Sequence, residues 1–200
     1  MVDAKTIAFY DTASFDYAEK FKSSKPDRYL RAFMALLPDG AEVLDLGCGP
    51  AFASAHMRNA GFKVDPVDAS DGMIKVANDV HDIGARKLTF DEIDMVAAYD
   101  GVWANFSLLH ADRADLPRHL SAIATALRPD GVFHVGLKVG TGAARDKIDR
   151  LYTYVTVEEL EGLLTDAGFT LLGTDLGEVK GMAGTVDPWV IIRARKADHA

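Results

Sequence analysis

The chain has almost no cysteine, because Cys48 stands alone among 200 residues. A single cysteine excludes an internal disulfide and is typical of a protein in the reducing cytosol. No apolar run approaches the roughly 18 residues of a membrane-spanning helix, and the first residues lack a basic segment followed by an apolar one. We therefore expect a cytoplasmic protein without a membrane partner.

Positive charge is also scarce. Lys and Arg number 22 against 30 Asp and Glu, which gives a formal net charge of −8, and no Lys/Arg-rich run is present. Because nucleic-acid binding needs a basic surface, we expect no nucleic-acid partner. Clusters of His and Cys with metal-ligand spacing are missing as well, so we expect no metal site.

Strand and helix signals alternate along the chain, which is typical of βαβ units and a mainly parallel sheet. The stretch 138–150 is rich in glycine and charge, without apolar periodicity, and is expected to be a long functional or irregular connector. Two strands near 169–175 and 189–194, separated by a glycine-rich turn, are expected to form an antiparallel pair at the sheet edge.

The segment Val43–Ala51 is an apolar strand that breaks into a glycine turn. Gly47 and Gly49 let the backbone approach a ligand closely, because glycine has no Cβ. Asp45 lies on the strand just before the turn, and the third glycine of dinucleotide-binding turns is missing. A carboxylate beside a pyrophosphate would be unfavourable, so the turn favours a cationic or zwitterionic ligand.

A second carboxylate ends the next expected strand. Asp68 lies about 20 residues beyond the glycine turn, where nucleoside-binding α/β folds place a ribose-binding acid. One carboxylate accepts charge-assisted hydrogen bonds from two ribose hydroxyls. Asp65 is the competing candidate, but it lies mid-strand, before Pro66.

Together these segments resemble the first two motifs of the class I S-adenosylmethionine-dependent methyltransferases. Residues 99–103, with an aromatic–Asp pair, and 126–133, with a Leu-Arg-Pro-Asp-Gly turn, resemble two later motifs of that class. Phe52, Ala53 and Asp130 depart from the usual pattern without affecting the expected fold. The resemblance implies an α/β, doubly wound, mostly parallel seven-stranded sheet with one antiparallel strand and helices on both faces.

The resemblance also implies the reaction, which is methyl transfer from S-adenosylmethionine to a small-molecule acceptor, with S-adenosylhomocysteine as product. An in-line displacement needs proximity and orientation rather than a nucleophile or a metal. One domain over 1–200 is expected, with an N-terminal helical lid (1–38), a cofactor-binding core (41–138) and an acceptor-side segment (139–200). The protein would be a monomer or homodimer. A nicotinamide-dependent oxidoreductase and a non-catalytic binding module remain alternatives.

Cofactor contacts follow from the matched motifs. Asp45 would lie near the ammonium group or, alternatively, stabilise the turn, and Asp68 would bind the ribose. An acid after the third strand would accept a hydrogen bond from the adenine amino group. Asp91 is the first choice for this acid, and Glu92 and Asp94 are the alternatives. The full set of expected contacts is Asp45, Gly47, Cys48, Gly49, Asp68, Ala69, Met73, Asp91, Glu92, Asn105, Phe106 and Tyr17.

Other residues are expected at the acceptor end. Asn105 and Phe106 follow the fourth strand and would form a pocket wall, with Asn105 a candidate catalytic residue. His110 would be a general base or would only hold a loop. Met73 would cover adenine or belong to a helix core. The stretch 138–154 would form the opposite wall, or a solvated loop, through Arg145, Arg150, Tyr152 and Tyr154.

An aromatic N-terminal segment precedes the sheet. Tyr17 or Tyr10 would close over the cofactor carboxylate, with Arg28 as an ionic partner; alternatively this aromatic face simply packs on the sheet. His134 is expected to be a core residue. The surface histidines are expected to be His56, His81, His119 and His199.

Overall fold

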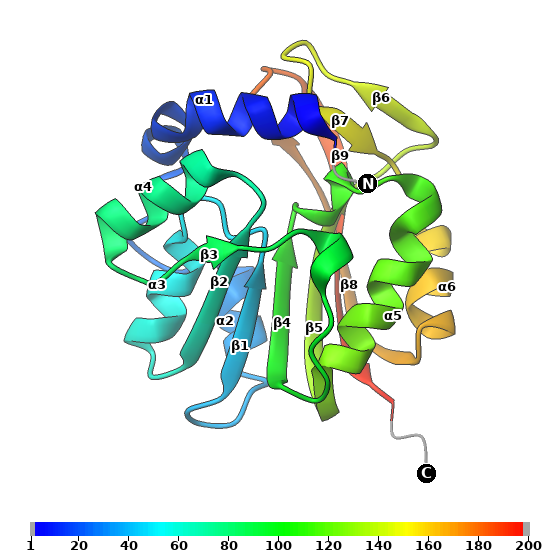
Figure 1. Ribbon diagram of the computed structural model, residues 1–200. Coiled ribbons are helices and arrows are strands. Elements are labelled where there is room, and N and C mark those ends of the chain that lie inside the picture. The colour runs from blue at the N-terminus through cyan, green and yellow to red at the C-terminus, as the bar shows by residue number, and fades with distance from the viewer. Residues whose placement is uncertain (1–2, 198–200) are drawn as a thin grey trace.

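A seven-stranded sheet forms the centre of the protein, and helices cover both of its faces (Figure 1). The computed structural model describes residues 3–197, apart from the side chains at positions 179 and 180. The strand order is β3-β2-β1-β4-β5-β9-β8, and β9 runs antiparallel to both β5 and β8. The expected fold class is therefore confirmed.

Strands and helices alternate along the chain up to β5, as the sequence predicts. The strands are β1 (Glu42–Leu46), β2 (Lys63–Asp68), β3 (Arg86–Lys87), β4 (Tyr99–Asn105), β5 (Leu127–Lys138), β6 (Ala143–Arg145), β7 (Leu151–Thr153), β8 (Phe169–Lys180) and β9 (Val186–Lys196). The helices are α1 (Ala4–Phe21), α2 (Arg28–Met34), α3 (Phe52–Asn59), α4 (Asp71–His81), α5 (Leu116–Ala126) and α6 (Val157–Asp166). Short 3₁₀ turns cover Phe90–Glu92, Leu108–His110 and Arg113–Asp115.

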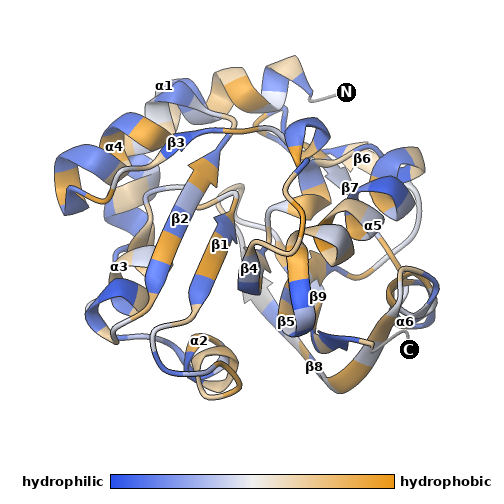
Figure 2. Cartoon of the chain, turned by 60° about the horizontal axis from the view of Figure 1, so that its bottom comes forward, coloured by the Kyte–Doolittle hydropathy of each residue, from blue (hydrophilic) through white to orange (hydrophobic). Residues whose placement is uncertain are grey.

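Side-chain alternation along the central strands builds two hydrophobic layers. Val43 and Trp103 point toward α2 and α3, whereas Leu44 and Val102 point toward α5 and α6. Hydrophobic residues accordingly run along the strands and the helix sides that face them (Figure 2). Because helices cover both faces, a ligand of this sheet is expected to bind at the strand ends.

Two segments differ from the sequence prediction. The sequence predicts a third strand around residues 87–90, but β3 covers only Arg86–Lys87, because the chain then turns into the 3₁₀ segment Phe90–Glu92. The stretch expected to be an irregular connector contains β6, which pairs with β7 as a separate two-stranded sheet. All three residues of β6 are exposed, so the strand has no buried face and shows no alternation of apolar and polar residues in the sequence.

Helix α1 lies across the strand ends toward which the parallel arrows point (Figure 1). Two ion-paired hydrogen bonds join Asp3 to Arg145 of β6, at 3.0 and 2.6 Å. Thr6 Oγ1 accepts from the backbone N–H of Leu151. At the other side Asp11 accepts from the Ser70 hydroxyl, at the start of α4. Hydrogen bonds therefore hold α1 to the β6–β7 pair on one side and to the start of α4 on the other.

The contact between α1 and α4 depends on a glycine. A Cβ on Gly72 would lie 2.6 Å from the backbone oxygen of Asp11. We expect Gly72→Ala to push α1 away and lower the melting temperature, since relieving such an overlap typically costs about 1 to 3 kcal/mol. Gly162→Ala is the matched control, because this helical glycine has nothing within 4 Å; it should raise stability by up to about 1 kcal/mol. Equal melting temperatures for the two variants would contradict the prediction.

Candidate active site

A cavity of about 520 Å³ opens at the carboxyl ends of β1, β2 and β4, beneath α1. This is the strand edge where open α/β sheets bind their ligands. Ten of the twelve expected cofactor contacts line it, and they are Asp45, Gly47, Cys48, Gly49, Asp68, Ala69, Met73, Asn105, Phe106 and Tyr17. His110 lines it too. The structure therefore brings together residues from the glycine turn, the end of β2, the end of β4 and the N-terminal helix.

The glycine turn has the left-handed backbone that glycine tolerates. Gly47 has φ of +75° and Gly49 has φ of +53°. The backbone N–H groups of Gly47 and Cys48 both donate to the Val67 carbonyl at 2.9 Å, which ties the turn to β2. A Cβ on Gly47 would lie 2.3 Å from Ser107 Cβ, whereas one on Gly49 would meet nothing within 4 Å. The first glycine is required by packing and the second leaves space for a ligand.

Two carboxyl groups lie in the cavity wall beside this turn. Asp45 is 2% exposed and accepts a hydrogen bond of 2.5 Å from the Ser54 hydroxyl. Burial raises the pKa of Asp45 to about 7. Asp68 accepts from the backbone N–H groups of Gly49 and Ser70 at 2.8 and 2.9 Å, and burial raises its pKa as well. Such buried acids are favourable for a ligand that carries hydroxyl groups and positive charge.

The raised pKa of Asp45 predicts that this group lowers stability as the pH rises. The folded protein holds the Asp45 proton up to about pH 7, whereas the unfolded chain releases it near 3.8, so the free energy of unfolding falls between these values. His110 has the opposite effect: its folded-state pKa of about 4 lies below the usual 6.5, so its contribution raises the free energy of unfolding as the pH increases between these values. Asp45→Asn isolates the aspartate. We expect its stability relative to the parent, from urea unfolding, to rise as the pH increases from about 4 to about 8. A difference that stays constant over that range would contradict a raised pKa.

Asp91 and Glu92 are not in the cavity wall. The 3₁₀ turn directs Asp91 to an ion pair with Arg118 of α5 at 2.6 Å, while Glu92 accepts from Thr89. The cavity wall at this point is made by Leu88 and Phe90 instead. An adenine ring there would meet apolar surface. The remaining alternative, Asp94, is likewise absent from the described cavity wall.

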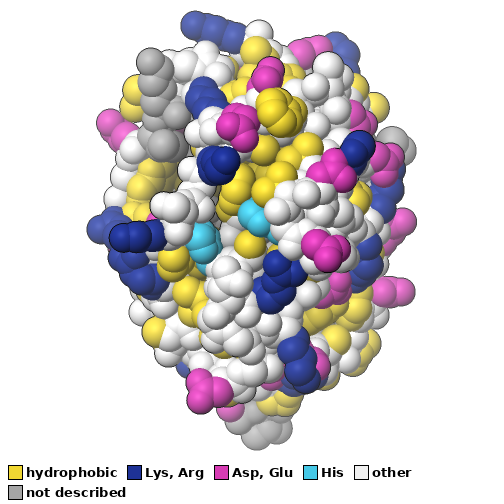
Figure 3. Space-filling view, turned by 90° about the vertical axis from the view of Figure 1, so that its left-hand side faces the viewer, with side chains coloured by type: hydrophobic (Ala, Val, Ile, Leu, Met, Phe, Trp, Pro, Cys, Tyr) yellow, Lys and Arg dark blue, Asp and Glu magenta, His cyan; other side chains and the backbone are white. Residues whose placement is uncertain are grey.

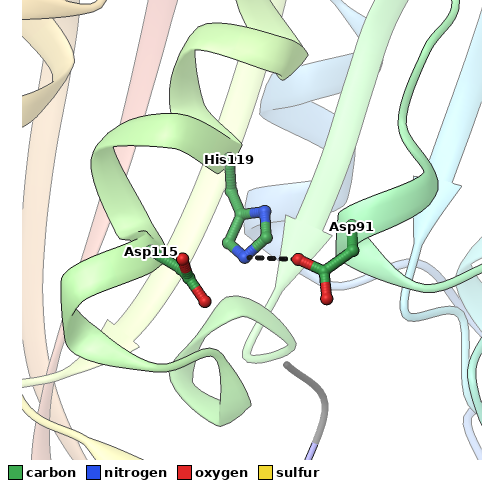
Figure 4. A group of neighbouring side chains, drawn as sticks. All are labelled: Asp91, Asp115 and His119. Atoms are coloured by element: carbon green, nitrogen blue, oxygen red, sulfur yellow. Dashed lines mark ion pairs between the residues drawn. The ribbon is translucent and has the colours of Figure 1, made fainter.

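His119 is 3% exposed and was wrongly expected at the surface. It lies beside Asp91 and Asp115, and the three side chains converge (Figure 4). Their potential metal-ligand atoms lie within 4.8 Å of one another. Arg118 pairs with both carboxylates, at 2.6 and 3.0 Å, so a cationic side chain already occupies this group. His56 and His81 are half-buried, and His199 lies outside the described residues.

His110 belongs to a hydrogen-bonded chain at the far end of the cavity. Its Nδ1 lies 2.7 Å from the Leu151 carbonyl, which can only accept, so Nδ1 carries the hydrogen. Burial lowers the His110 pKa to about 4, and the neutral ring therefore offers Nε2 as an acceptor. The Tyr10 hydroxyl donates to Nε2 at 2.9 Å and accepts from Arg150 Nη1 at 3.0 Å. Of the two tyrosines expected near the cofactor, Tyr10 forms the hydrogen bond to His110.

Tyr17 packs edge-on against Tyr10 with ring centroids 5.6 Å apart and lines the cavity. Arg28 does not line it, and instead stacks on the Tyr29 ring and donates to its hydroxyl. In the loop between α1 and α2, Lys25 is the described cationic residue that lines the cavity wall.

Asn105 and Phe106 end β4 in an unusual conformation. Phe106 has φ of +58°, which a bulky residue adopts only where the surroundings enforce it. Asn105 Oδ1 lies 3.1 Å from His134 Nε2, and His134 stacks on Trp103 with ring centroids 3.7 Å apart. The amide oxygen thus accepts from a fully buried imidazole. His134 is a core residue, as expected.

Sequence analysis missed Trp103 as a cavity residue. Trp103 lies inside β4, where an apolar residue gives no sign that it borders a ligand space. Lys138 begins the stretch expected to form the opposite wall and does line the cavity. Arg150 and Tyr152 were expected on this side and do line the cavity, whereas Arg145 pairs with Asp3 and Tyr154 lies outside the described wall. An aromatic and β-branched run over 151–155 was the available signal for β7.

The geometry agrees with a family comparison. A model described as "Methyltransferase domain" matches residues 17–173. The chain belongs to this methyltransferase family. The match confirms the resemblance to the class I S-adenosylmethionine-dependent methyltransferases, whose cofactor is S-adenosylmethionine.

Individual curated proteins match only about half of this chain. The chain is 35% identical over 102 residues to a malonyl-[acyl-carrier protein] O-methyltransferase of Pectobacterium atrosepticum, covering 50% of this chain and 40% of that protein. It is 32% identical over 105 residues to a ubiquinone biosynthesis O-methyltransferase of Caulobacter vibrioides, covering 48% and 40%. The chain thus spans about two fifths of the length of these curated relatives.

Solved structures match over nearly the whole chain. The 1,6-didemethyltoxoflavin-N1-methyltransferase of Burkholderia thailandensis, with bound 1,6-didemethyltoxoflavin and S-adenosylhomocysteine, is 26% identical with a TM-score of 0.73, covering 98% of this chain and 88% of that one. A methyltransferase of Methanosarcina mazei is 17% identical with a TM-score of 0.75, covering 86% and 99%. The latter likeness shows the fold alone.

Proposed function

We propose that the chain transfers the methyl group of S-adenosylmethionine to a small-molecule acceptor by in-line displacement. The observation that supports this most directly is the single cavity in which the glycine turn, Asp45 and Asp68 face the Tyr10–His110 pair. The Burkholderia relative, which has 1,6-didemethyltoxoflavin and S-adenosylhomocysteine bound, supports a small-molecule acceptor.

The cofactor would extend along the carboxyl ends of β1 and β2. In this proposal Asp68 binds the ribose hydroxyls, Asp45 lies near the ammonium group, and Gly47 and Gly49 border the methionine part. Cys48, Ala69 and Met73 complete this wall. Leu88 and Phe90 take the place at the adenine that the sequence had suggested for Asp91, and Tyr17 covers the cofactor from α1.

When bound, S-adenosylmethionine supplies a methyl group on a sulfonium that is already a good leaving group. The chain's own residues then have to align the acceptor and exclude water, and alignment can contribute roughly 7 to 11 kcal/mol of the barrier. Asn105 and Phe106, fixed at the end of β4, would border the reacting centre. In this proposal α1 is the lid of the expected N-terminal segment 1–38, because α2 packs on the sheet through Leu30 and Phe33. The core over 41–138 and the segment 139–200 supply the cofactor and acceptor sides.

His110 is a weak base in this arrangement. The lowered pKa keeps its ring neutral at pH 7, and Nε2 already accepts from Tyr10. Proton removal by a base whose pKa matches the working pH accelerates a reaction roughly 10² to 10⁴-fold. A base with a pKa of about 4 gives a smaller acceleration. His110 and Tyr10 therefore act mainly by orienting the acceptor.

The surroundings favour a free small molecule over a macromolecular partner. Cationic and acidic side chains intermingle on the face in Figure 3, without a basic surface for nucleic acid. Among residues 3–197, none of the helices is both long and apolar enough to cross a bilayer. We propose a cytoplasmic protein that acts as a monomer or homodimer.

Cofactor binding followed by product analysis tests the proposal. S-Adenosylhomocysteine should raise the melting temperature, whereas NADH should not, and incubation with methyl-labelled S-adenosylmethionine and a metabolite panel should label a small product. Stabilisation by NADH alone would identify an oxidoreductase. Tight binding of S-adenosylmethionine with no labelled product across the panel would identify a non-catalytic module.

A further inference from the structure

Two cationic side chains lie in the cavity wall around His110. Lys138, at the end of β5, is 9% exposed, and Arg150, just before β7, is 3% exposed. Burying a charge is costly unless it is paired, so cations at such depth need both a partner and a role. They also stand out in a chain whose net charge is −8.

Each cation is held from outside the cavity wall by its own carboxylate. Lys138 Nζ lies 2.6 Å from Asp187 Oδ2. Arg150 donates to Asp146 through Nε and Nη2, at 3.0 and 2.7 Å. Lys138 and Arg150 line the cavity, whereas neither Asp146 nor Asp187 belongs to its wall. A ligand would thus meet the cations, with their counterions behind them.

The ring of Tyr152 contacts both cations. The Lys138 ammonium lies 3.7 Å and the Arg150 guanidinium 5.1 Å from the centroid of the Tyr152 ring. Arg150 is further held by its bond to the Tyr10 hydroxyl. The two donors are therefore positioned before a ligand arrives, which lowers the cost of binding.

Buried acids and buried cations occupy different parts of the cavity wall. Asp45 and Asp68 border the glycine turn, where a cationic cofactor would lie, whereas Lys138 and Arg150 lie around His110. In a partly enclosed site such a separation orients a ligand as well as attracting it.

We propose that Lys138 and Arg150 bind a carboxylate of the methyl acceptor. This deepens the proposed function and rests on it, because the cofactor is taken to lie beside Asp45 and Asp68. The other source of a carboxylate is the cofactor itself. Lys25, a separate cation in the cavity wall between α1 and α2, is the residue we assign to that group.

Charge-matched ligands test the proposal without knowledge of the natural acceptor. Each carboxylic acid of a fragment panel, such as 4-hydroxybenzoate and 3,4-dihydroxybenzoate, is paired with its primary amide. Binding is measured by NMR titration with and without saturating S-adenosylhomocysteine. We expect the carboxylate to bind about 10-fold or more tightly than its amide, as for hydrogen bonds to charged groups.

Three variants locate the effect. Lys138→Met together with Asp187→Asn removes the ion pair without leaving a lone charge. It should reduce the preference to the part that Arg150 supplies, while the affinity for S-adenosylhomocysteine stays unchanged. Lys138→Arg keeps the charge and should retain the preference. Lys63→Met is the matched control, because this exposed lysine pairs with Glu42 away from the cavity, and should behave as the parent.

Other results overturn the inference. Absence of a carboxylate preference in every pair, including failure of all fragments to bind at millimolar concentration, refutes the anion site. A double variant that loses S-adenosylhomocysteine affinity but keeps the fragment preference shows that the cations hold the cofactor carboxylate instead. A parent that binds no S-adenosylhomocysteine yet prefers carboxylates refutes the proposed function and retains the anion site.

Discussion

Asp68→Ala is expected to weaken S-adenosylhomocysteine binding by about 100-fold or more, because two hydrogen bonds to a carboxylate are each worth about 1.5 to 3 kcal/mol. The same change also frees the backbone N–H groups of Gly49 and Ser70, so the glycine turn loses a support on the side of β2. Isothermal titration calorimetry measures the effect directly.

Two further variants separate ligand binding from support of the turn. Asp68→Asn keeps the shape and a carbonyl acceptor but loses the charge, so we expect an intermediate loss of affinity. Asp65→Ala is the matched control on the same strand, because Asp65 pairs with Arg86 and accepts from Tyr99 outside the cavity. Binding by Asp68→Ala as tight as that of the parent would refute the ribose assignment.

Gly47→Ala should cause the largest loss of stability of any single methyl addition proposed here. The new Cβ would overlap Ser107 Cβ at 2.3 Å, and the backbone would have to keep a φ of +75°. Left-handed strain of about 1 to 2 kcal/mol and overpacking of about 1 to 3 kcal/mol give an expected cost of about 2 to 5 kcal/mol. Urea unfolding measures it.

Gly40→Ala serves as the control for backbone strain alone. Gly40 has φ of +70° in the turn before β1 and nothing within 4 Å of its Cβ position. We expect it to lose only about 1 to 2 kcal/mol. Equal losses for the two variants would show that the contact with Ser107 yields easily and that the first glycine is retained for its backbone alone.

Much of the fold could be predicted because local signals and motif order agree. The strand before Gly47 lies where the sequence places it. Ser70 caps α4, and Thr156 and Glu159, three residues apart, form a capping box at the start of α6. These features depend on neighbours in the chain, which sequence patterns describe well.

Features that depend on distant contacts were harder to predict. Asp91 follows strand three as the pattern requires, yet its partner Arg118 lies in α5 and draws the carboxylate away from the cavity. His119 is polar in sequence but buried between α5 and the 3₁₀ turn at Phe90, whose ring it contacts edge-on. Spacing in the sequence cannot reveal such tertiary partners.

The acceptor end was predicted only in outline for the same reason. The chain Leu151–His110–Tyr10–Arg150 joins residues from β7, the turn after β4 and α1. Separations of up to 140 residues lie between hydrogen-bonded partners, so the tautomer of His110 follows only from the three-dimensional arrangement. The separation of buried acids from buried cations in the cavity wall likewise became apparent only when β5 and β7 were placed.

The attachment of Asp3 to Arg145 has a practical consequence for handling the protein. Asp3 lines the cavity and caps α1, so a purification tag fused ahead of the chain would be attached close to the cavity wall. Strand β9 ends at the opposite end of the sheet (Figure 1). Assays and ligand screens should therefore use a carboxyl-terminal tag, or a cleaved amino-terminal one, so that the fusion does not itself interfere with ligand binding.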